Sequence, residues 1–302
     1  MRHGVIIDVS KPIDGVVEQV SKLAEQGVAT AWCSQIFGYD ALTLLAVVGR
    51  EVPGIELGTA VVPTYPRHPV MLAAQALTTQ AATGGRLVLG IGLSHQIVIE
   101  GMFGYSFDRP ARHMREYLSA LMPLLDGQAV SHQGETVSAN TMAPLDVVVD
   151  EPPPVLLAAL GPTMLKLAGQ RTAGTVTWMT GPATIASHIV PSITKAAEDA
   201  GKPPPRVAVG LPVAVTTDVE RARETADRTF AIYGQLPSYR AMLDREGAEG
   251  PAHVAIVGDE ESVASQIQAV ADAGATDFSA APFGSADEIS HTVGLIATLA
   301  KG

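Results

Sequence analysis

The residues of this sequence that could take part in chemistry follow short apolar runs, and most of them are uncharged. Gly, Ser, Thr and amide side chains are frequent in segments 34–36, 60–65, 92–96, 159–163, 178–182 and 281–284. Such residues let a planar ligand approach the backbone closely and offer neutral hydrogen bonds to its edges. These segments contain no paired carboxylates, no His/Asp/Glu metal cluster and no G-x-S-x-G motif. We therefore expect no metal site, and we expect an organic cofactor to carry out the difficult chemical step.

Two glycine motifs are candidate phosphate sites. The run 89–95 (LGIGLSH) contains G-x-G, but it lacks the third glycine of a dinucleotide fingerprint and no helix opens directly after it. The run 160–164 (LGPTM) follows an apolar segment, and Pro162 suits the first position of a helix. Free backbone N–H groups at such a helix start can bind a phosphate. Ordinary helix initiation is the alternative interpretation.

The elements that must position these residues alternate along the chain. β-Branched runs predict strands over 5–8, 30–34, 55–62, 87–91, 155–159, 175–179, 207–215 and 276–281, and segments of helical period lie between them. Eight strand-plus-helix units predict an α/β fold, a (β/α)8 TIM barrel, with insertions after strands four and seven. We expect 93–110 to be loop, 127–153 irregular or hairpin structure, and 218–251 a long excursion. An open doubly wound sheet shows the same alternation, and strand counting does not exclude it.

A barrel places its functional residues at the carboxyl ends of the strands, where the neutral segments lie. We expect one domain over residues 1–302, because no segment resembles a linker. Hydrophobic residues make up 47% of the chain and charged residues 17%, which predicts a large buried core. The net charge of −11 argues against a nucleic-acid partner. The first apolar run is too short for a signal peptide, and no run approaches the roughly 20 residues of a membrane helix, so we expect a cytoplasmic protein.

Four segments in the same order resemble the bacterial luciferase-like family, and in particular its branch of F420-dependent oxidoreductases. They are 57–69 (LGTAVVPTYPRHP), 84–92 (GGRLVLGIG), 159–169 (ALGPTMLKLAG) and 271–278 (ADAGATDF). The resemblance covers nearly the whole chain and is thinnest over 96–153. It implies a hydride-transfer oxidoreductase that uses coenzyme F420 on a small organic substrate, and a homodimer. An FMN-dependent monooxygenase and a non-catalytic F420-binding protein are the alternatives.

Carried over residue by residue, the resemblance implies a cis peptide bond between Ala60 and Val61 that supports the deazaflavin ring. The turn from Leu160 to Thr163 would bind the coenzyme phosphate. The full set of expected coenzyme contacts is Ser34, Gln35, Thr59, Ala60, Val61, Gly92, Leu93, Ser94, His95, Leu160, Gly161, Pro162 and Thr163.

The sequence departs from the family at the end of the second strand. Many F420 enzymes of this family have an Asp-His pair there, whereas this chain has Gln35 and Ile36. Neither side chain can donate a proton. We retain His95 and Gln35 as catalytic candidates, with hydrogen bonding to the coenzyme as the alternative for His95.

Three further residues are expected to line the substrate pocket, namely Tyr65, His68 and Trp178. Core packing is the alternative for the two aromatic residues, and helix initiation is the alternative for His68. Arg86 precedes the fourth strand, and we therefore interpret it as structural. Asp40 and Asp259 are expected helix N-caps, and Cys33 is expected to be a buried, inert thiol.

Overall fold

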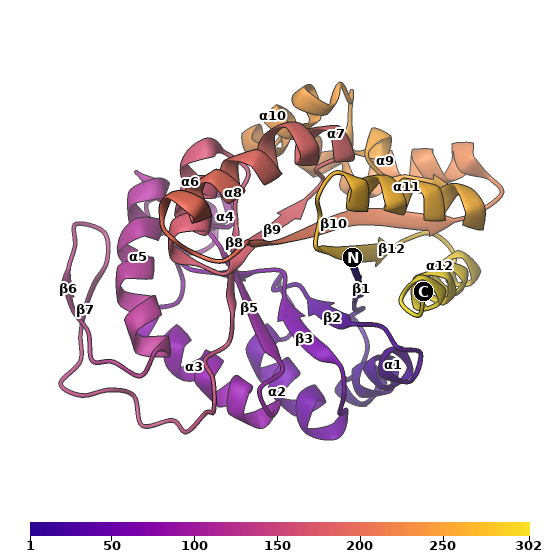
Figure 1. Cartoon of the computed structure of the whole chain (residues 1–302). Coiled ribbons are helices and arrows are strands. Elements are labelled where there is room, and N and C mark those ends of the chain that lie inside the picture. The colour runs from indigo at the N-terminus through magenta and orange to yellow at the C-terminus, as the bar shows by residue number, and fades with distance from the viewer.

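Eight parallel strands form a closed barrel, because the last of them pairs with the first (Figure 1). The computed structural model describes all 302 residues. In order around the barrel the strands are β1 (Arg2–Ile6), β2 (Thr30–Cys33), β3 (Glu56–Thr59), β5 (Leu87–Gly92), β8 (Val155–Ala158), β9 (Gly174–Trp178), β10 (Arg206–Val215) and β12 (Asp277–Pro282). The predicted (β/α)8 barrel is thereby confirmed, and the open sheet is excluded.

A ring of helices surrounds the strands. It contains α1 (Ile13–Glu25), α2 (Ala41–Glu51), α3 (Pro69–Ala82), α5 (Pro110–Leu125), α6 (Pro162–Arg171), α8 (Val190–Asp199), α11 (Glu260–Asp272) and α12 (Ala286–Leu299). The predicted caps are confirmed: the carboxylate of Asp40 accepts from Thr43 N at 2.9 Å, and that of Asp259 accepts from Ser262 N at 2.9 Å. Such caps satisfy amide groups that have no partner inside the helix. No helix is both long and apolar enough to cross a membrane.

The inside of the barrel is filled by two tryptophans for which glycines make room. A Cβ on Gly4 would lie 2.7 Å from the Trp32 indole, and one on Gly58 would lie 2.3 Å from it. On the opposite side, a Cβ on Gly210 would lie 3.0 Å from Trp178. Outward-facing apolar residues of the strands pack instead against the helices in a cluster of 63 buried residues. Both faces of the sheet are therefore buried, as a parallel sheet requires.

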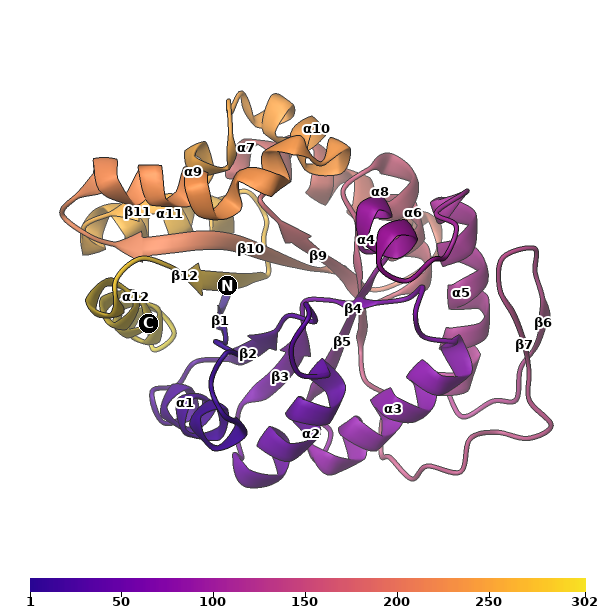
Figure 2. The same ribbon diagram turned by 180° about the vertical axis from the view of Figure 1, so that it is seen from behind.

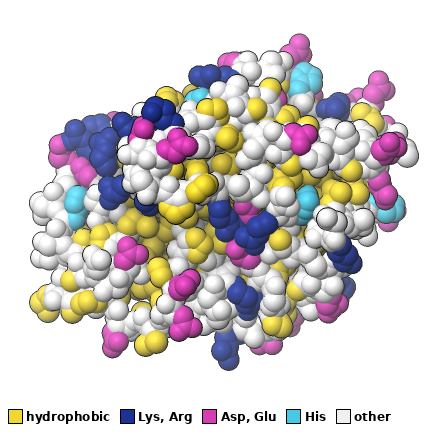
Figure 3. Space-filling view, in the orientation of Figure 1, with side chains coloured by type: hydrophobic (Ala, Val, Ile, Leu, Met, Phe, Trp, Pro, Cys, Tyr) yellow, Lys and Arg dark blue, Asp and Glu magenta, His cyan; other side chains and the backbone are white.

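The amino-terminal end of the barrel is closed by ion pairs. Arg206 contacts the carboxylates of Glu56 at 3.0 Å and of Asp277, and Arg2 contacts Glu56 at 3.0 Å. Burial acts to lower the pKa of Arg206, but its hydrogen bonds to Asp277 and Glu56 outweigh this effect and raise the pKa. On this face, basic and acidic side chains lie next to one another near the centre (Figure 3). Arg86, as predicted, is structural: its guanidinium donates to the carbonyls of Gly49, Val52 and Ile55.

The insertion after the fourth barrel strand contains more structure than predicted. Helix α4 (Gln96–Gly101) lies inside the segment expected to be loop, because six residues are too few to show a helical period. The predicted hairpin exists as β6 (Ser131–Gln133) and β7 (Ser138–Asn140), which project beside α5 (Figure 1).

The excursion after the seventh strand is also structured. It contains α9 (Val219–Gln235), α10 (Pro237–Glu246), a 3₁₀ turn η2 (Pro251–His253) and an extra strand, β11 (Ile256–Gly258), that pairs with the end of β10. The helical segment after β9 begins with α7 (Pro182–Thr184) and a π-helical turn η1 (Ile185–Ile189), and α8 follows. The predicted strand over 55–62 is interrupted, and its last part is the short β4 (Val62–Pro63).

Candidate coenzyme and substrate site at the barrel mouth

The carboxyl ends of the barrel strands form a mouth on the side of α4 and β4, which faces the viewer in Figure 2. The expected site residues here are mostly half-buried, so they are reachable and also partly shielded from water. The half-buried group is Ser34, Gln35, Ala60, Val61, Leu93, Ser94, His95, Leu160, Gly161 and Trp178. The structure therefore gathers residues from five strand ends that are far apart in the sequence.

The Ala60–Val61 segment and Gly92 form a floor of small groups at this mouth. The peptide bond between Ala60 and Val61 is cis, as the resemblance implied. A Cβ on Gly92 would lie 2.7 Å from Val61 Cγ2 and 3.1 Å from Ala158 Cβ. Only glycine therefore fits beneath Val61.

Thr59 lies behind this floor and not in it. Its side chain is fully buried, and its hydroxyl donates to Gly90 O at 2.8 Å and accepts from Gly90 N at 2.8 Å. The Thr59 side chain is therefore not offered to the mouth, and a coenzyme contact at Thr59 stays a prediction. The residue joins β3 to β5, and it supports Ala60 from the side facing away from the mouth.

The Gln35 side chain has a structural task that sequence position does not reveal. Its Oε1 accepts from Ala41 N at 2.7 Å and from Arg67 Nη2 at 3.3 Å, which fixes the start of α2. Arg67 in turn forms an ion pair with Asp40. The amide is thus occupied by the protein, and the expectation of a catalytic Gln35 finds no geometric support. The neighbouring Ser34 hydroxyl bonds to no protein group.

His95 precedes α4 and is the one imidazole at this mouth that no protein group holds by a hydrogen bond. Its ring lies 5.8 Å from the ring of Tyr239 on α10. Burial lowers its pKa below the ordinary value of 6.5, so the ring is neutral at pH 7. A half-buried neutral imidazole with free nitrogens can accept a proton or donate one hydrogen bond.

The turn from Leu160 to Thr163 opens α6 as the sequence predicted. Gly161 is the N-cap residue, no side chain caps the helix, and a Cβ on Gly161 would meet nothing within 4 Å. The amides of Thr163 and Met164 have no partner in the protein. The Leu160 carbonyl is fixed by His188 Nε2 of η1 at 2.8 Å. This helix start therefore offers two free donors at an open surface, which suits a phosphate.

The three expected pocket residues have different surroundings. Trp178 is half-buried at the end of β9 and contacts the rings of Phe230 and Tyr233. Tyr65 stacks on His113 at 3.9 Å, and burial raises the pKa of Tyr65 to about 12. His68 caps α3 through Nδ1, while its Nε2 bonds Ser138 O of β7 at 2.9 Å. Both ring nitrogens of His68 are therefore engaged by the protein, and the expectation that His68 lines a substrate pocket stays a prediction.

Sequence reasoning missed the aromatic residues that α9 and α10 bring to the mouth. Tyr233 and Tyr239 pack edge to face at 5.1 Å, and Phe230 contacts Trp178 at 6.0 Å. The only signal available was that three aromatic residues fall within ten positions of the segment 218–251, in a chain with 5% aromatic residues.

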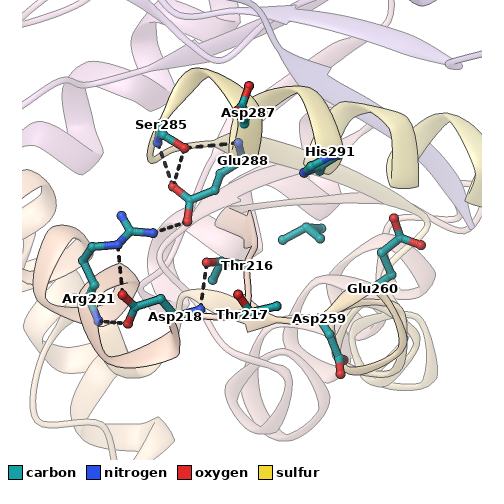
Figure 4. Close-up of a pocket in the computed structure, with 11 residues that line it drawn as sticks. Thr216, Thr217, Asp218, Arg221, Asp259, Glu260, Ser285, Asp287, Glu288 and His291 are labelled. Atoms are coloured by element: carbon teal, nitrogen blue, oxygen red, sulfur yellow. Dashed lines mark hydrogen bonds and ion pairs between the residues drawn. The ribbon is translucent and has the colours of Figure 1, made fainter.

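A separate hollow of about 470 Å³ lies on the rim between β10, α9, α11 and α12 (Figure 4). Its lining is mainly acidic and capping side chains, and Arg221 is paired with Asp218 and Glu288. Burial acts to raise the pKa of Glu288, but hydrogen bonds from Arg221 and Ser285 lower it to about 2. None of the expected site residues lines this hollow. Its negative charge also disfavours a phosphate, so it is not the coenzyme site.

Comparison with known proteins shows which protein family this chain matches. Residues 1–291 match the family described as luciferase-like monooxygenase. The chain therefore belongs to this family, and it is an oxidoreductase of the luciferase-like class.

Two relatives are similar over most of their length. An uncharacterized protein of Mycobacterium tuberculosis is 27% identical over 256 residues, covering 78% of this chain and 75% of the relative. The 5,10-methylenetetrahydromethanopterin reductase of Methanolobus tindarius is 25% identical over 260 residues, covering 85% and 78%.

Solved structures share the fold at low identity. The coenzyme F420-dependent tetrahydromethanopterin reductase of Methanopyrus kandleri has a TM-score of 0.81 at 22% identity, covering 98% of this chain and 97% of that one. An F420-dependent secondary alcohol dehydrogenase has a TM-score of 0.83 at 16% identity, with the same coverage. A Baeyer–Villiger monooxygenase of Pseudomonas putida in complex with FMN has a TM-score of 0.77 at 17% identity, covering 98% and 96%.

Proposed function

We propose that this protein is a coenzyme F420-dependent oxidoreductase that transfers a hydride between the deazaflavin and a small organic substrate. One relative supports this proposal by name, a protein of Mycobacterium tuberculosis named as a putative coenzyme F420-dependent oxidoreductase, which is 28% identical over 173 residues, or 53% of this chain. The structural observation that carries the proposal is the pairing of a floor of small, uncharged residues at the mouth with free amide donors at the start of α6.

The residues present fit such a coenzyme. Ala60 and Gly92 have little or no side chain, and Val61 packs over Gly92, so this segment suits the close approach of a planar ring. Gly161 and the amides of Thr163 and Met164 are placed to bind the phosphate of its tail. The bound coenzyme supplies the hydride chemistry. The protein holds the ring, shields its buried face from water and leaves the other face to the substrate.

Neither Gln35 nor Ile36 can transfer a proton to or from the substrate. The Gln35 amide is engaged by Ala41 and Arg67, and Ile36 is an exposed aliphatic residue. His95 is the titratable group with free nitrogens at the mouth, and its lowered pKa keeps it neutral at pH 7. We propose that His95 accepts the substrate proton when the substrate is oxidised, and returns it in the reverse direction.

An FMN-dependent monooxygenase is the second candidate, because the FMN-bound Baeyer–Villiger enzyme has the same fold. Titration of the purified protein with F420 and with FMN, followed by coenzyme fluorescence and absorbance, decides between them. We expect saturable binding of F420 and weaker binding of FMN. Tight FMN binding without F420 binding would overturn the proposal. F420 binding without turnover on a broad substrate panel would favour a non-catalytic binding protein.

The phosphate assignment can be tested by placing a negative charge at the start of α6. We expect Gly161→Glu to weaken F420 binding at least about tenfold, because a charge-assisted hydrogen bond contributes roughly 1.5–3 kcal/mol. Gly294→Glu on exposed α12 adds the same charge away from the mouth, and its F420 affinity should equal that of the wild type. Equal affinities of both variants in the fluorescence titration would refute the assignment.

A further inference from the structure

Six side chains form a continuous aromatic wall along one side of the mouth. Neighbouring rings have centroids 5.1–6.0 Å apart, and the steps among Trp178, Phe230, Tyr233, Tyr239 and Phe283 are all edge to face. Strand ends contribute half of the wall, and the insertion α9–α10 contributes the other half. In order its members are His95, Tyr239, Tyr233, Trp178, Phe230 and Phe283.

The polar atoms of this wall lack protein partners. The indole Nε1 of Trp178 is buried and makes no hydrogen bond. The hydroxyls of Tyr233 and Tyr239 also bond to no protein group, although they are not fully shielded from solvent. Packing alone does not explain this pattern, because a buried donor without a partner costs about 1–3 kcal/mol. The pattern is expected where a ligand completes the hydrogen bonding.

Every member of the wall is uncharged at pH 7. Burial raises the pKa of Tyr233 and of Tyr239, and it lowers the pKa of His95. A charged ligand would lose its hydration here without gaining a counter-ion, and that loss is unfavourable.

We propose that the aromatic wall is the substrate subsite, and that it binds an uncharged, ring-bearing molecule through a carbonyl-type acceptor. Aromatic rings 5–6 Å apart offer edge and face contacts that favour a planar guest. The acceptor would receive the hydroxyl proton of Tyr233, which no protein group accepts, and the N–H of Trp178 is a second donor without a protein partner. The inference rests on the proposed function for the reaction, but binding at the wall does not require the coenzyme.

Three probes that share a benzene ring test this subsite. Acetophenone is neutral with an acceptor, toluene is neutral without one, and benzoate is an anion. Dissociation constants come from ligand-detected NMR titrations of the full chain, with and without F420. We expect acetophenone to bind at least about fivefold more tightly than toluene, and about tenfold more tightly than benzoate.

A single hydroxyl deletion separates recognition from packing. Tyr233→Phe should remove the preference for acetophenone over toluene and leave the affinity for toluene within about twofold of the wild type. Tyr105→Phe is the matched control, because Tyr105 is 49% exposed and lies outside the wall. Its probe affinities should match those of the wild type. Thermal melts of both variants show whether the fold is intact.

Several results would overturn the subsite. They are benzoate binding as tightly as acetophenone, an unchanged preference in Tyr233→Phe, or no saturable binding of any probe. The proposed function fails independently: probe binding as expected, with no binding of F420, would refute the coenzyme and leave the subsite standing. Binding of F420 without binding of the probes would refute the subsite and leave the coenzyme assignment standing.

Discussion

The protonation state of His95 depends both on its position in the chain and on the residues around it. It follows barrel strand β5 and precedes α4, so its ring reaches the mouth. Tyr239 of the insertion lies 5.8 Å away and contributes to the burial that lowers the pKa of His95. A neutral imidazole is a proton acceptor at pH 7, whereas an exposed one would be partly protonated.

The link between Tyr239 and His95 can be measured without a substrate. In the wild-type protein we expect an NMR titration of the His95 ring to give a pKa below 6.5. Tyr239→Ala should move that pKa up toward 6.5, because water then reaches the ring. Loss of the signal in His95→Gln assigns it. Tyr105→Ala changes an exposed aromatic residue elsewhere and should leave the value unaltered. An unchanged pKa in Tyr239→Ala would show that another group desolvates the ring.

Sequence position predicted where site residues lie better than what their side chains contact. Ser34, Ala60, Gly92, His95 and Gly161 all reach the mouth, because strand ends follow directly from the strand pattern. The side-chain tasks of three other residues depend on partners distant in sequence. Thr59 bonds Gly90, Gln35 bonds Arg67, and His68 bonds Ser138. A single sequence does not reveal such pairs, since no local pattern records them.

At the scale of elements, one carboxylate of the insertion α9–α10 binds the start of α7 beside the barrel. Glu246 at the end of α10 accepts from Ala183 N at 3.0 Å and from Thr184 N at 2.7 Å, and it thereby caps α7. A carboxylate is favourable at a helix start because of the free amides and the helix dipole. The contact therefore fixes α10, and with it Tyr239, relative to the mouth.

Removing this charge should loosen the insertion. We expect Glu246→Gln to lower the local opening free energy of α10 by about 1–2 kcal/mol, since one charged cap is replaced by a neutral one. Amide hydrogen exchange in α10 should then be about 5–30 times faster, with the barrel strands unaffected. Asp244→Asn on the same helix removes only an exposed pair with Arg240, and its exchange should change little. Equal exchange in both variants would contradict the fastening role of Glu246.

The elements that could be predicted are those with their own local pattern. The eight barrel strands are apolar runs buried on both faces, and this pattern sets them apart from the helices. Helix α9 was missed because its buried side is short and small: only Ala222 and Ala226 are fully buried. Strand β11 was missed because three residues that pair with the end of β10 carry no period of their own.

The whole molecule is a barrel with two unlike ends. The amino-terminal end is closed by Arg2, Arg206, Glu56 and Asp277, and it is highly polar. The mouth at the other end has a small-residue floor and the uncharged aromatic wall. Because the two ends differ in this way, the stabilising charges lie far from the reacting groups. The mouth therefore stays neutral for a planar coenzyme and an uncharged substrate.

The stability of the whole molecule should depend on pH through its buried histidines. Burial lowers the pKa of His113 to about 4, and it also lowers those of His3 and His95. Between pH 4.5 and 6.5 the unfolded chain therefore binds protons that the folded chain does not. The free energy of unfolding must then rise with pH across this window and level off above it. Protonation of carboxylates with a lowered pKa, such as Glu288, reduces the free energy of unfolding mainly below this pH window.

His113 should account for a large share of this dependence, because it is 7% exposed and stacks on Tyr65. One buried histidine contributes roughly 2–3 kcal/mol across two pH units, at about 1.4 kcal/mol per unit. Urea unfolding at pH 4.5, 5.5, 6.5 and 7.5 measures the slope. We expect a clearly smaller slope in His113→Gln, whereas His291→Gln on the exposed surface of α12 should keep that of the wild type. A wild-type slope in His113→Gln, or stability that increases as the pH falls, would show that His113 is protonated in the folded protein.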